Sequence, residues 1–271
     1  MGYNNISFSV EDRVANITFK RPERLNAFSE DMEDEIISAV RAADEDPGIR
    51  VLVIKGDGGK AFSSGHDIKD SAELPPRDIA QWRAKMKRDI LLTYSVWDCS
   101  KPVIASIDGL CLAGGLEFAL CCDIRYCSEP SRFGSVEVRF SHGSDTMIMP
   151  WVIGQRCRSL LYTGDIIDAQ EALRIGLVDK VFPSDELHTG TMKLAHRMSR
   201  VALECLRFNK RAINHTFELM GLRTALEFGN ETCAIMDAIS SPEADTFDAI
   251  KRSQGLTPAL KWLSAQFEPY Q

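Results

Sequence analysis

The sequence has no long apolar run, no excess of positive charge and no cysteines in a CxxC pair. Its longest weakly polar stretch, residues 109–122, contains Glu117 and is too short and too charged to span a membrane. Lys and Arg total 32 against 39 Asp and Glu, and the resulting formal charge of −7 disfavours binding to nucleic acid or to an anionic membrane. Any anionic ligand must therefore be held by local groups.

The cysteines are few for a chain of 271 residues and show no CxxC spacing suited to zinc. We therefore expect reduced, mostly buried thiols and no metal site. The first twenty residues carry neither the apolar segment of a signal peptide nor an Arg-rich transit pattern, which predicts a cytoplasmic protein. The eight cysteines are at positions 99, 111, 121, 122, 127, 157, 205 and 233.

The composition is that of a compact globular protein, because 44% of the residues are hydrophobic and 26% are charged. Strand and helix patterns alternate along the first two thirds of the chain, which predicts an α/β fold. The expected elements are a hairpin over residues 5–20, a helix capped by Ser29 and ended by residues 46–48, a buried strand at 51–54, a helix at 78–96, a strand at 102–108, a short helix after Gly114-Gly115 and a strand at 124–126.

The last third differs, because residues 185–199, 201–219 and 221–240 have helix patterns and little strand pattern. We predict a core domain over residues 1–200 and a C-terminal helical region over residues 201–271 that packs on the core or on a neighbouring subunit.

Residues 61–67 form a small-residue loop that directly follows a buried strand and a Gly-rich turn. Small residues allow close backbone approach, so amides of this loop can bind a ligand oxygen. An ordinary surface crossover is the alternative. Ser64 and His66 do not suggest a nucleophile and its base, because neither serine of the loop lies in a GxSxG elbow.

Residues 107–117 predict a strand that runs through Gly114-Gly115 into a short helix. Amides at such a helix start are unpaired and favour negative charge, which suits an oxyanion hole for a carbonyl that gains charge. A glycine pair that only allows close packing of helix and strand is the alternative.

Three carboxylates have small or apolar sequence neighbours. Glu117 lies within an apolar segment, where burial would raise its pKa, Glu137 follows twenty residues later, and Asp145 follows eight further on. Each can equally be a salt-bridged or solvated acid. Together with an oxyanion hole, they indicate acid–base chemistry at carbon next to a thioester.

In order and spacing, these segments resemble the crotonase superfamily, whose namesake is enoyl-CoA hydratase, over nearly the whole chain. The markers are Lys20-Arg21-Pro22-Glu23-Arg24-Leu25-Asn26-Ala27, Ala61-Phe62-Ser63-Ser64-Gly65-His66-Asp67-Ile68, Lys101-Pro102-Val103-Ile104-Ala105, Ala113-Gly114-Gly115-Leu116-Glu117, Cys122-Asp123-Ile124-Arg125, and Tyr162-Thr163-Gly164 through Gly176-Leu177-Val178.

The resemblance implies a crotonase-like spiral of ββα units with a C-terminal helical trimerisation region, in homotrimers or homohexamers. It implies that the backbone N–H groups of His66 and Gly114 form the oxyanion hole. It also implies that Glu117 deprotonates water and Glu137 protonates the α carbon in an enoyl-CoA hydratase reaction.

A coenzyme A thioester is the implied substrate, with no further cofactor and no metal. Because coenzyme A is polyanionic, basic side chains must meet its phosphates; Arg24 is the first candidate and Lys261, of this or another subunit, is the second. The residues that the resemblance assigns to coenzyme A binding are Arg24, Ala27, Phe62, Ser64, Gly65, Asp67, Ile68 and Gly115.

The chain departs from the family pattern at residues 139–151, where hydratases usually carry a Gly-rich stretch. Asp145 has the spacing of an acid that dienoyl-CoA isomerases use, although those enzymes place aspartate at the position of Glu117. A dienoyl-CoA or enoyl-CoA isomerase, or an acyl-CoA hydrolase, that uses Glu137 and Asp145 is therefore the alternative. A non-enzymatic CoA-ester binder or an RNA binder is a third class, disfavoured by the acidic charge and by two apolar-flanked glutamates.

Overall fold

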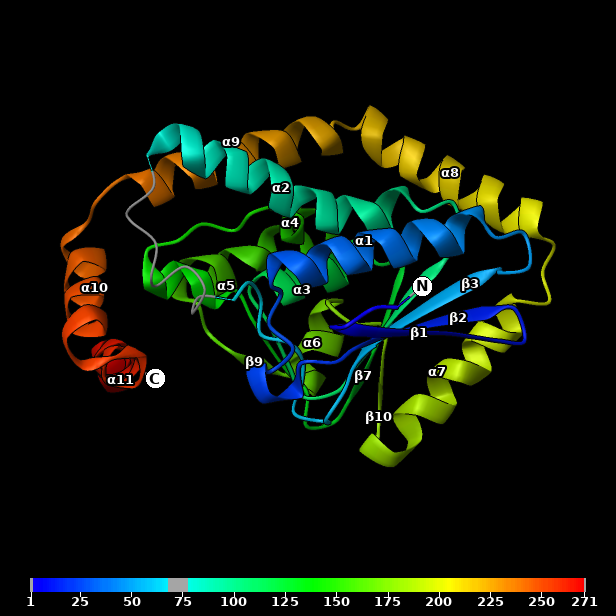
Figure 1. Ribbon diagram of the computed structural model, residues 1–271, viewed down its shortest axis with the longest axis horizontal. Coiled ribbons are helices and arrows are strands. Elements are labelled where there is room, and N and C mark those ends of the chain that lie inside the picture. Colours follow the sequence, from blue (N-terminus) through cyan, green and yellow to red (C-terminus); the bar gives the residue numbers. More distant parts are fainter. Residues whose placement is uncertain (1, 68–77, 271) are drawn as a thin grey trace.

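The computed structural model describes residues 2–67 and 78–270. Their strands form two sheets, one with the order β1-β2-β3-β5-β7-β10 and a smaller one with the order β4-β6-β8-β9 (Figure 1). The strands are β1 Ile6–Glu11, β2 Val14–Phe19, β3 Val51–Gly56, β4 Ala61–Ser63, β5 Val103–Ile107, β6 Leu110–Leu112, β7 Ile124–Ser128, β8 Arg132–Gly134, β9 Ile167–Asp168 and β10 Lys180–Phe182.

The α-helices cover these sheets and form most of the last third of the chain. They are α1 Glu30–Glu45, α2 Ile79–Asp98, α3 Gly114–Cys121, α4 Met149–Ile153, α5 Cys157–Thr163, α6 Ala169–Ile175, α7 Ser184–Met198, α8 Leu203–Leu219, α9 Leu222–Ala238, α10 Pro242–Gln254 and α11 Leu256–Phe267. Short 3-10 helices span Pro22–Arg24, Val136–Phe140, Gly154–Arg156 and Glu268–Tyr270.

Strand β3 shows why the larger sheet is covered on both faces. Val51 and Val53 pack in a cluster with residues of α7, whereas Leu52 and Ile54 belong to the main core, which includes the buried face of α1. Side chains alternate between the faces of a strand, so an uninterrupted apolar run requires cover on both. The predicted buried parallel strand is confirmed, because β3 is parallel to β2 and β5.

Successive strand pairs link the two sheets into a spiral. β3, β5 and β7 of the larger sheet are each followed by β4, β6 and β8 of the smaller sheet, and a helix follows each pair. This repeat confirms the predicted spiral of ββα units. It also places the ends of β4, β6 and β8, with the loops that follow them, at one edge of the smaller sheet.

The predicted N-terminal hairpin and the predicted starts of α1 and α2 are confirmed as well. β1 and β2 form an antiparallel hairpin, and the Ser29 hydroxyl accepts a hydrogen bond from the Met32 amide at the start of α1. Asp78 caps α2, where its carboxylate accepts from the Gln81 amide at 2.8 Å. These caps satisfy amides that have no partner within the helix.

The helices after residue 200 include two that pack on the core and two that pack on each other and on the 3-10 helix Val136–Phe140. α9 lies beside α2 (Figure 1), where Asn230 donates a hydrogen bond to the carbonyl of Met86 at 2.9 Å. α10 and α11 enclose a separate apolar cluster around Phe247 and Leu263. The three predicted helical segments are confirmed as α7, α8 and α9.

None of the helices in the described ranges is both long enough and apolar enough to cross a bilayer. All eight cysteines are free, and every one except Cys205 is buried. The prediction of mostly buried thiols is confirmed.

Candidate active site

The loop after β4 presents the backbone amide of His66. Phe28 and His66 form an isolated parallel bridge, in which the Phe28 amide donates to the Gly65 carbonyl at 2.8 Å and the Asp67 amide donates to the Phe28 carbonyl at 2.9 Å. In this pattern the amide of His66 points away from the bridge. Within the described chain, that amide donates to no other backbone group.

The second amide belongs to Gly114, the first residue of α3. The amides of Leu116 and Glu117 both donate to the carbonyl of Ala113, at 2.9 and 3.1 Å, whereas the Gly114 amide has no backbone acceptor among the described residues. Ala113 has a φ of 48° and a ψ of −130°, a conformation that costs energy for any residue with a side chain. The strained turn leaves the start of α3 open to a ligand oxygen.

The two amide loops are in direct contact. A Cβ atom added at Gly65 would lie 3.0 Å from the amide nitrogen of Gly114, and one added at Gly114 would lie 2.8 Å from Nε2 of His66. Glycine is therefore required at position 65 by its φ of +93° and at position 114 by the His66 ring. The predicted oxyanion donors thus lie on adjoining backbone segments.

Glu117 projects from the first turn of α3, a helix whose residues are all buried. Its Oε1 accepts a hydrogen bond from the Ser144 hydroxyl, and its Oε2 accepts from the Thr146 amide at 3.2 Å. An amide can only donate, so the contact with Thr146 favours the carboxylate form of Glu117. The segment from residue 144 to residue 146 therefore fixes this side chain.

Glu137 lies in the 3-10 helix Val136–Phe140, and its Oε1 accepts a hydrogen bond from the Ser135 hydroxyl. Its Oε2 is buried and has no hydrogen-bond partner in the described structure. A cavity of about 530 Å³ lies beside it. The cavity is lined by Glu137 together with Ser135, Ser144, Met147, Leu161 and Met236, among others.

Burial and nearby carboxylate charge shift the pKa of both glutamates upward. Burial raises the pKa of Glu117 well above its usual range, and the charges of Asp145 and Glu137 add to this effect, while the Ser144 hydrogen bond opposes it. Burial also raises the pKa of Glu137 to about 7, against the hydrogen bond from Ser135. Both carboxyls therefore hold a proton more readily than a solvated glutamate does, a property suited to acid–base chemistry.

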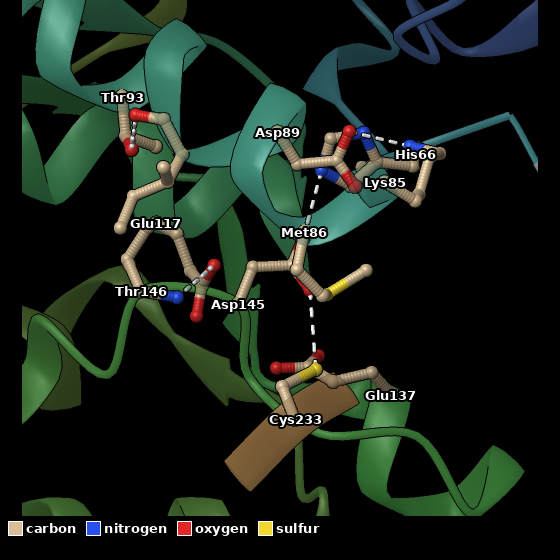
Figure 2. Close-up of polar contacts among 12 residues, drawn as sticks. His66, Lys85, Met86, Asp89, Thr93, Glu117, Glu137, Asp145, Thr146 and Cys233 are labelled. Carbon is tan, nitrogen blue, oxygen red and sulfur yellow. Dashed lines mark hydrogen bonds and ion pairs between the residues drawn. The ribbon is translucent and has the colours of Figure 1, made fainter. Parts of the chain in front are cut away.

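The carboxyl group of Asp145 lies between His66 and Cys233 (Figure 2). Its Oδ2 lies 3.0 Å from Nε2 of His66, and its Oδ1 accepts from the Cys233 thiol at 3.4 Å. The other ring nitrogen, Nδ1 of His66, lies 3.0 Å from Oε1 of Glu33. Asp145 is therefore engaged in an ion pair, and among the described residues it is not part of the cavity wall.

Further charges surround this ion pair. Asp89 of α2 bonds Lys85 at 2.5 Å, and Arg88 lies 3.5 Å from Glu33. Ligand atoms of Glu33, His66 and Asp89 lie within 4.8 Å of one another, a spacing that a metal ion could use. The ammonium of Lys85 and the imidazole of His66 already bind these carboxylates, so the donor set fits an ion-pair cluster better than a metal centre.

Most residues assigned to coenzyme A lie around the amide loops. The Ala27 carbonyl accepts from Arg21, and the Ser64 amide donates to the Leu25 carbonyl. The Phe62 side chain is wholly buried among other phenylalanine rings, so only its backbone can meet a ligand. Asp67 is paired with Arg21 at 2.9 Å, and Ile68 lies outside the described residues.

The two basic candidates are far apart in sequence and lie on different elements. Arg24 ends the 3-10 helix Pro22–Arg24 and is half-buried, while Lys261 is exposed on α11. Neither side chain has an ion-pair partner in the part of the chain that the structure describes.

Gly115, also assigned to coenzyme A binding, lies against Ser63. A Cβ added at Gly115 would meet the Ser63 carbonyl oxygen at 2.6 Å.

Sequence reasoning missed the residues that support the glutamates and His66. Ser144 and Ser135 each lie one or two residues from a predicted acid, but hydroxyl groups near an acid are too common to serve as a signal. Glu33 offered a better sequence signal, because it follows Met32 on the buried face of a predicted helix. A carboxylate at such a position needs a partner.

The ββα spiral, the paired amide loops and the buried glutamates together define a member of the crotonase superfamily. Within it, the chain belongs to the enoyl-CoA hydratase/isomerase family, whose pattern matches residues 9–237. The fold is similar to the crystal structure of an enoyl-CoA hydratase/isomerase from Xanthobacter autotrophicus Py2, with a TM-score of 0.95 and 34% identity over 98% of this chain and 99% of that one.

Two relatives extend this finding. A crotonyl-CoA hydratase from Syntrophomonas wolfei is 33% identical over 275 residues, covering 98% of this chain and 99% of the relative. A short-chain-enoyl-CoA hydratase from Clostridium acetobutylicum is 32% identical over 238 residues, covering 85% of this chain and 88% of the relative.

Proposed function

We propose that this protein is an enoyl-CoA hydratase, which adds water across the 2,3 double bond of an acyl-CoA thioester. The observation that carries the proposal is a cavity that Glu137 lines directly and that reaches the residue supporting Glu117. Glu137 lines the cavity directly, and Ser144, which bonds Glu117, lines the same cavity. The names of the relatives support the same reaction class.

The proposed reaction begins with Glu117 as the base. Its two hydrogen bonds, from the Ser144 hydroxyl and the Thr146 amide, favour the carboxylate and oppose the burial that raises its pKa. Glu117 takes a proton from water while the water oxygen forms a bond to the β carbon. The electron pair of the double bond moves to the thioester oxygen and creates an enolate.

The enolate oxygen is proposed to accept hydrogen bonds from the amides of His66 and Gly114, and the removal of one such donor typically costs about 3–4 kcal/mol in the barrier. Glu137, whose pKa is about 7, then gives its proton to the α carbon. The carbonyl re-forms. A proton then passes from Glu117 to Glu137, directly or through solvent, and both acids return to their starting states. No cofactor beyond the coenzyme A thioester itself enters the reaction.

The isomerase and hydrolase alternatives depend on Asp145 as the second acid at the cavity. Its carboxylate instead bonds the ring of His66 and the thiol of Cys233. The two hydratase relatives described above support hydration over those alternatives.

We further propose that the chain forms trimers through its helical region. α8 and α9, with the residue that follows α9, expose several large apolar side chains: Phe208, Ile213, Leu219, Phe228, Ile235 and Ile239. Contact between subunits would cover them, and it would allow Lys261 of one subunit to approach the coenzyme A bound near Arg24 of another. Light scattering of the purified protein measures the assembly directly.

A substrate panel tests the proposed reaction. Crotonyl-CoA, a longer 2-enoyl-CoA, an aromatic enoyl-CoA and a 3,5-dienoyl-CoA are incubated with the protein in ¹⁸O-labelled water, and the absorbance of the conjugated thioester is followed. Loss of conjugation with one labelled oxygen in the product is expected for the 2-enoyl substrates. Conversion of the dienoyl thioester without label, together with inert 2-enoyl thioesters, would contradict hydration and indicate an isomerase.

A further inference from the structure

Three consecutive residues connect the two halves of the site. The Ser144 hydroxyl and the Thr146 amide both bond Glu117, while Asp145 between them turns the other way and bonds His66 (Figure 2). One short segment therefore fixes the proposed base on one side and the amide loop on the other. A shift of this segment would move both.

The His66 ring is held at both of its nitrogens. Nδ1 lies 3.0 Å from Glu33, and Nε2 lies 3.0 Å from Asp145. Only the doubly protonated imidazolium can donate to two carboxylates at once. Burial alone would lower the pKa of His66, but the charges and hydrogen bonds of Asp89, Asp145 and Glu33 outweigh it and raise that pKa well above its usual range.

The ring also touches the second amide loop. A Cβ atom at Gly114 would lie 2.8 Å from both Cδ2 and Nε2 of His66, so the imidazole packs directly on this glycine. His66 thus contributes its own amide to the site and bears, through its side chain, on the residue that carries the other amide.

We propose that Asp145 is a positioning residue that holds the His66 imidazolium against Gly114 and thereby fixes the distance between the two oxyanion amides. This inference rests on the proposed function. It assigns to Asp145 neither a proton transfer nor a contact with substrate, in contrast to the role that its sequence spacing suggests.

A purely electrostatic role for Asp145 is disfavoured, because several charged groups surround the His66 ring. The groups that face or adjoin the His66 ring are Glu33 of α1, Lys85, Arg88 and Asp89 of α2, Glu117 of α3, Glu137 and Asp145 of the following loops, and Cys233 of α9. The cations of the ion-pair cluster are His66, Lys85 and Arg88, and each has carboxylate partners. The charge of the His66 ring is therefore offset by Glu33 and Asp145 on its two sides, and geometry is what the pair with Asp145 supplies.

The test measures polarisation of the carbonyl, which does not depend on hydration. Butanoyl-CoA labelled with ¹³C at the carbonyl has no double bond to hydrate, and the infrared stretch of its carbonyl falls when two amides bond it. The wild type, Asp145→Ala, His66→Ala and the double variant are compared by this stretch and by kcat and KM for crotonyl-CoA.

We expect each single variant to lose most of the carbonyl shift and about 10- to 100-fold in kcat, the effect of a small misplacement. KM should change within about threefold. The double variant should fall no further than the lower single variant, because both remove the same contact. A full carbonyl shift in Asp145→Ala, or losses that multiply in the double variant, would overturn the proposal.

Two further variants separate positioning from loss of folding. Asp123→Asn removes a carboxylate from the ion pair with Lys210 at 2.8 Å, away from the cavity, and should keep the wild-type stretch and kcat. Asp145→Asn keeps the shape of the side chain but should lower the pKa of His66, which NMR of the ring measures. The carbonyl shift of butanoyl-CoA bound to this variant should disappear as pH rises through that pKa. A pH-independent shift of wild-type size in Asp145→Asn would overturn the proposal.

The same data keep this inference distinct from the proposed function. A wild type that shifts the carbonyl but does not hydrate crotonyl-CoA refutes the hydratase and leaves the role of Asp145 to be decided by the variants. A wild type that does neither refutes both.

Discussion

Glu117 and Glu137 carry the same type of side chain in very different settings. Glu117 is 3% exposed on a fully buried helix, and both of its carboxylate oxygens accept hydrogen bonds. Glu137 lies in a short 3-10 helix, with one oxygen bonded to Ser135 and the other without a partner in the described structure. The comparison separates an acid held at both oxygens from a cavity-lining acid that is held at only one.

This difference suggests a division of labour. A base that must aim water at one carbon benefits from a fixed carboxylate. An acid that delivers a proton needs a free oxygen and a pKa near neutrality, and Glu137 has both. Changes at each position should therefore have different kinetic signatures.

The largest effect is expected for Glu137→Gln, which removes the proton donor while keeping the shape of the side chain. Hydration of crotonyl-CoA should fall by about 10³-fold or more, with KM nearly unchanged. Stopped absorbance assays of the conjugated thioester measure it, and Glu129→Gln, an exposed glutamate on a turn, is the matched control. Turnover of Glu137→Gln near the wild-type rate would remove Glu137 from the mechanism.

Gly114→Ala tests the fixed half of the site. The new Cβ would collide with the His66 ring, which Glu33 and Asp145 prevent from moving, so the amide at position 114 must shift. We expect kcat to fall by about 100-fold. In a His66→Ala background the space is open, and the added alanine should cost little; an equal loss in both backgrounds would argue against the collision.

Ser144→Ala should have a smaller effect, because it weakens the support of Glu117 without removing a reacting group. The Ser144 hydrogen bond opposes the upward shift of the Glu117 pKa, so its loss raises that pKa further. The base must be ionised to act, and activity at acidic pH should therefore fall by about tenfold. A pH–rate profile measures the shift of the acidic limb toward higher pH, and Ser253→Ala on α10 serves as the control.

Ser135→Ala should give the smallest change in activity, confined to the alkaline limb of the pH–rate profile. Glu137 must be protonated to act as an acid, so kcat/KM of the wild type should decline as pH rises above about 7. The Ser135 hydrogen bond lowers the Glu137 pKa, so its removal should move this decline to higher pH. A limb that moves to lower pH, or one that persists unchanged in Glu137→Gln, would assign the titration to another group.

Local patterns in the sequence were enough to predict most of the elements that carry the site. The apolar run at 51–54, the cap at Ser29 and the Gly114-Gly115 turn each depend on interactions within a few residues, and each is confirmed. The buried setting of Glu117 also followed from its apolar neighbours. The two glutamates and the two amides stay predictions as catalytic groups.

The supporting contacts could not be predicted, because they join residues that are distant in sequence. Glu33 and His66 are 33 residues apart, and Ser144 and Glu117 are 27 apart. The sequence spacing of Asp145 pointed toward the cavity, whereas the fold turns its side chain to His66. Which face a loop residue presents depends on packing, which spacing does not encode.

The alternation of contacts along residues 144–146 also has a consequence for engineering acyl specificity. Inserting or deleting one residue there would exchange the sides that these side chains face and separate both loops from their anchors. Libraries that alter the acyl group accepted should therefore keep this tripeptide and its length, and vary apolar wall positions such as Met147, Leu161 and Met236 instead.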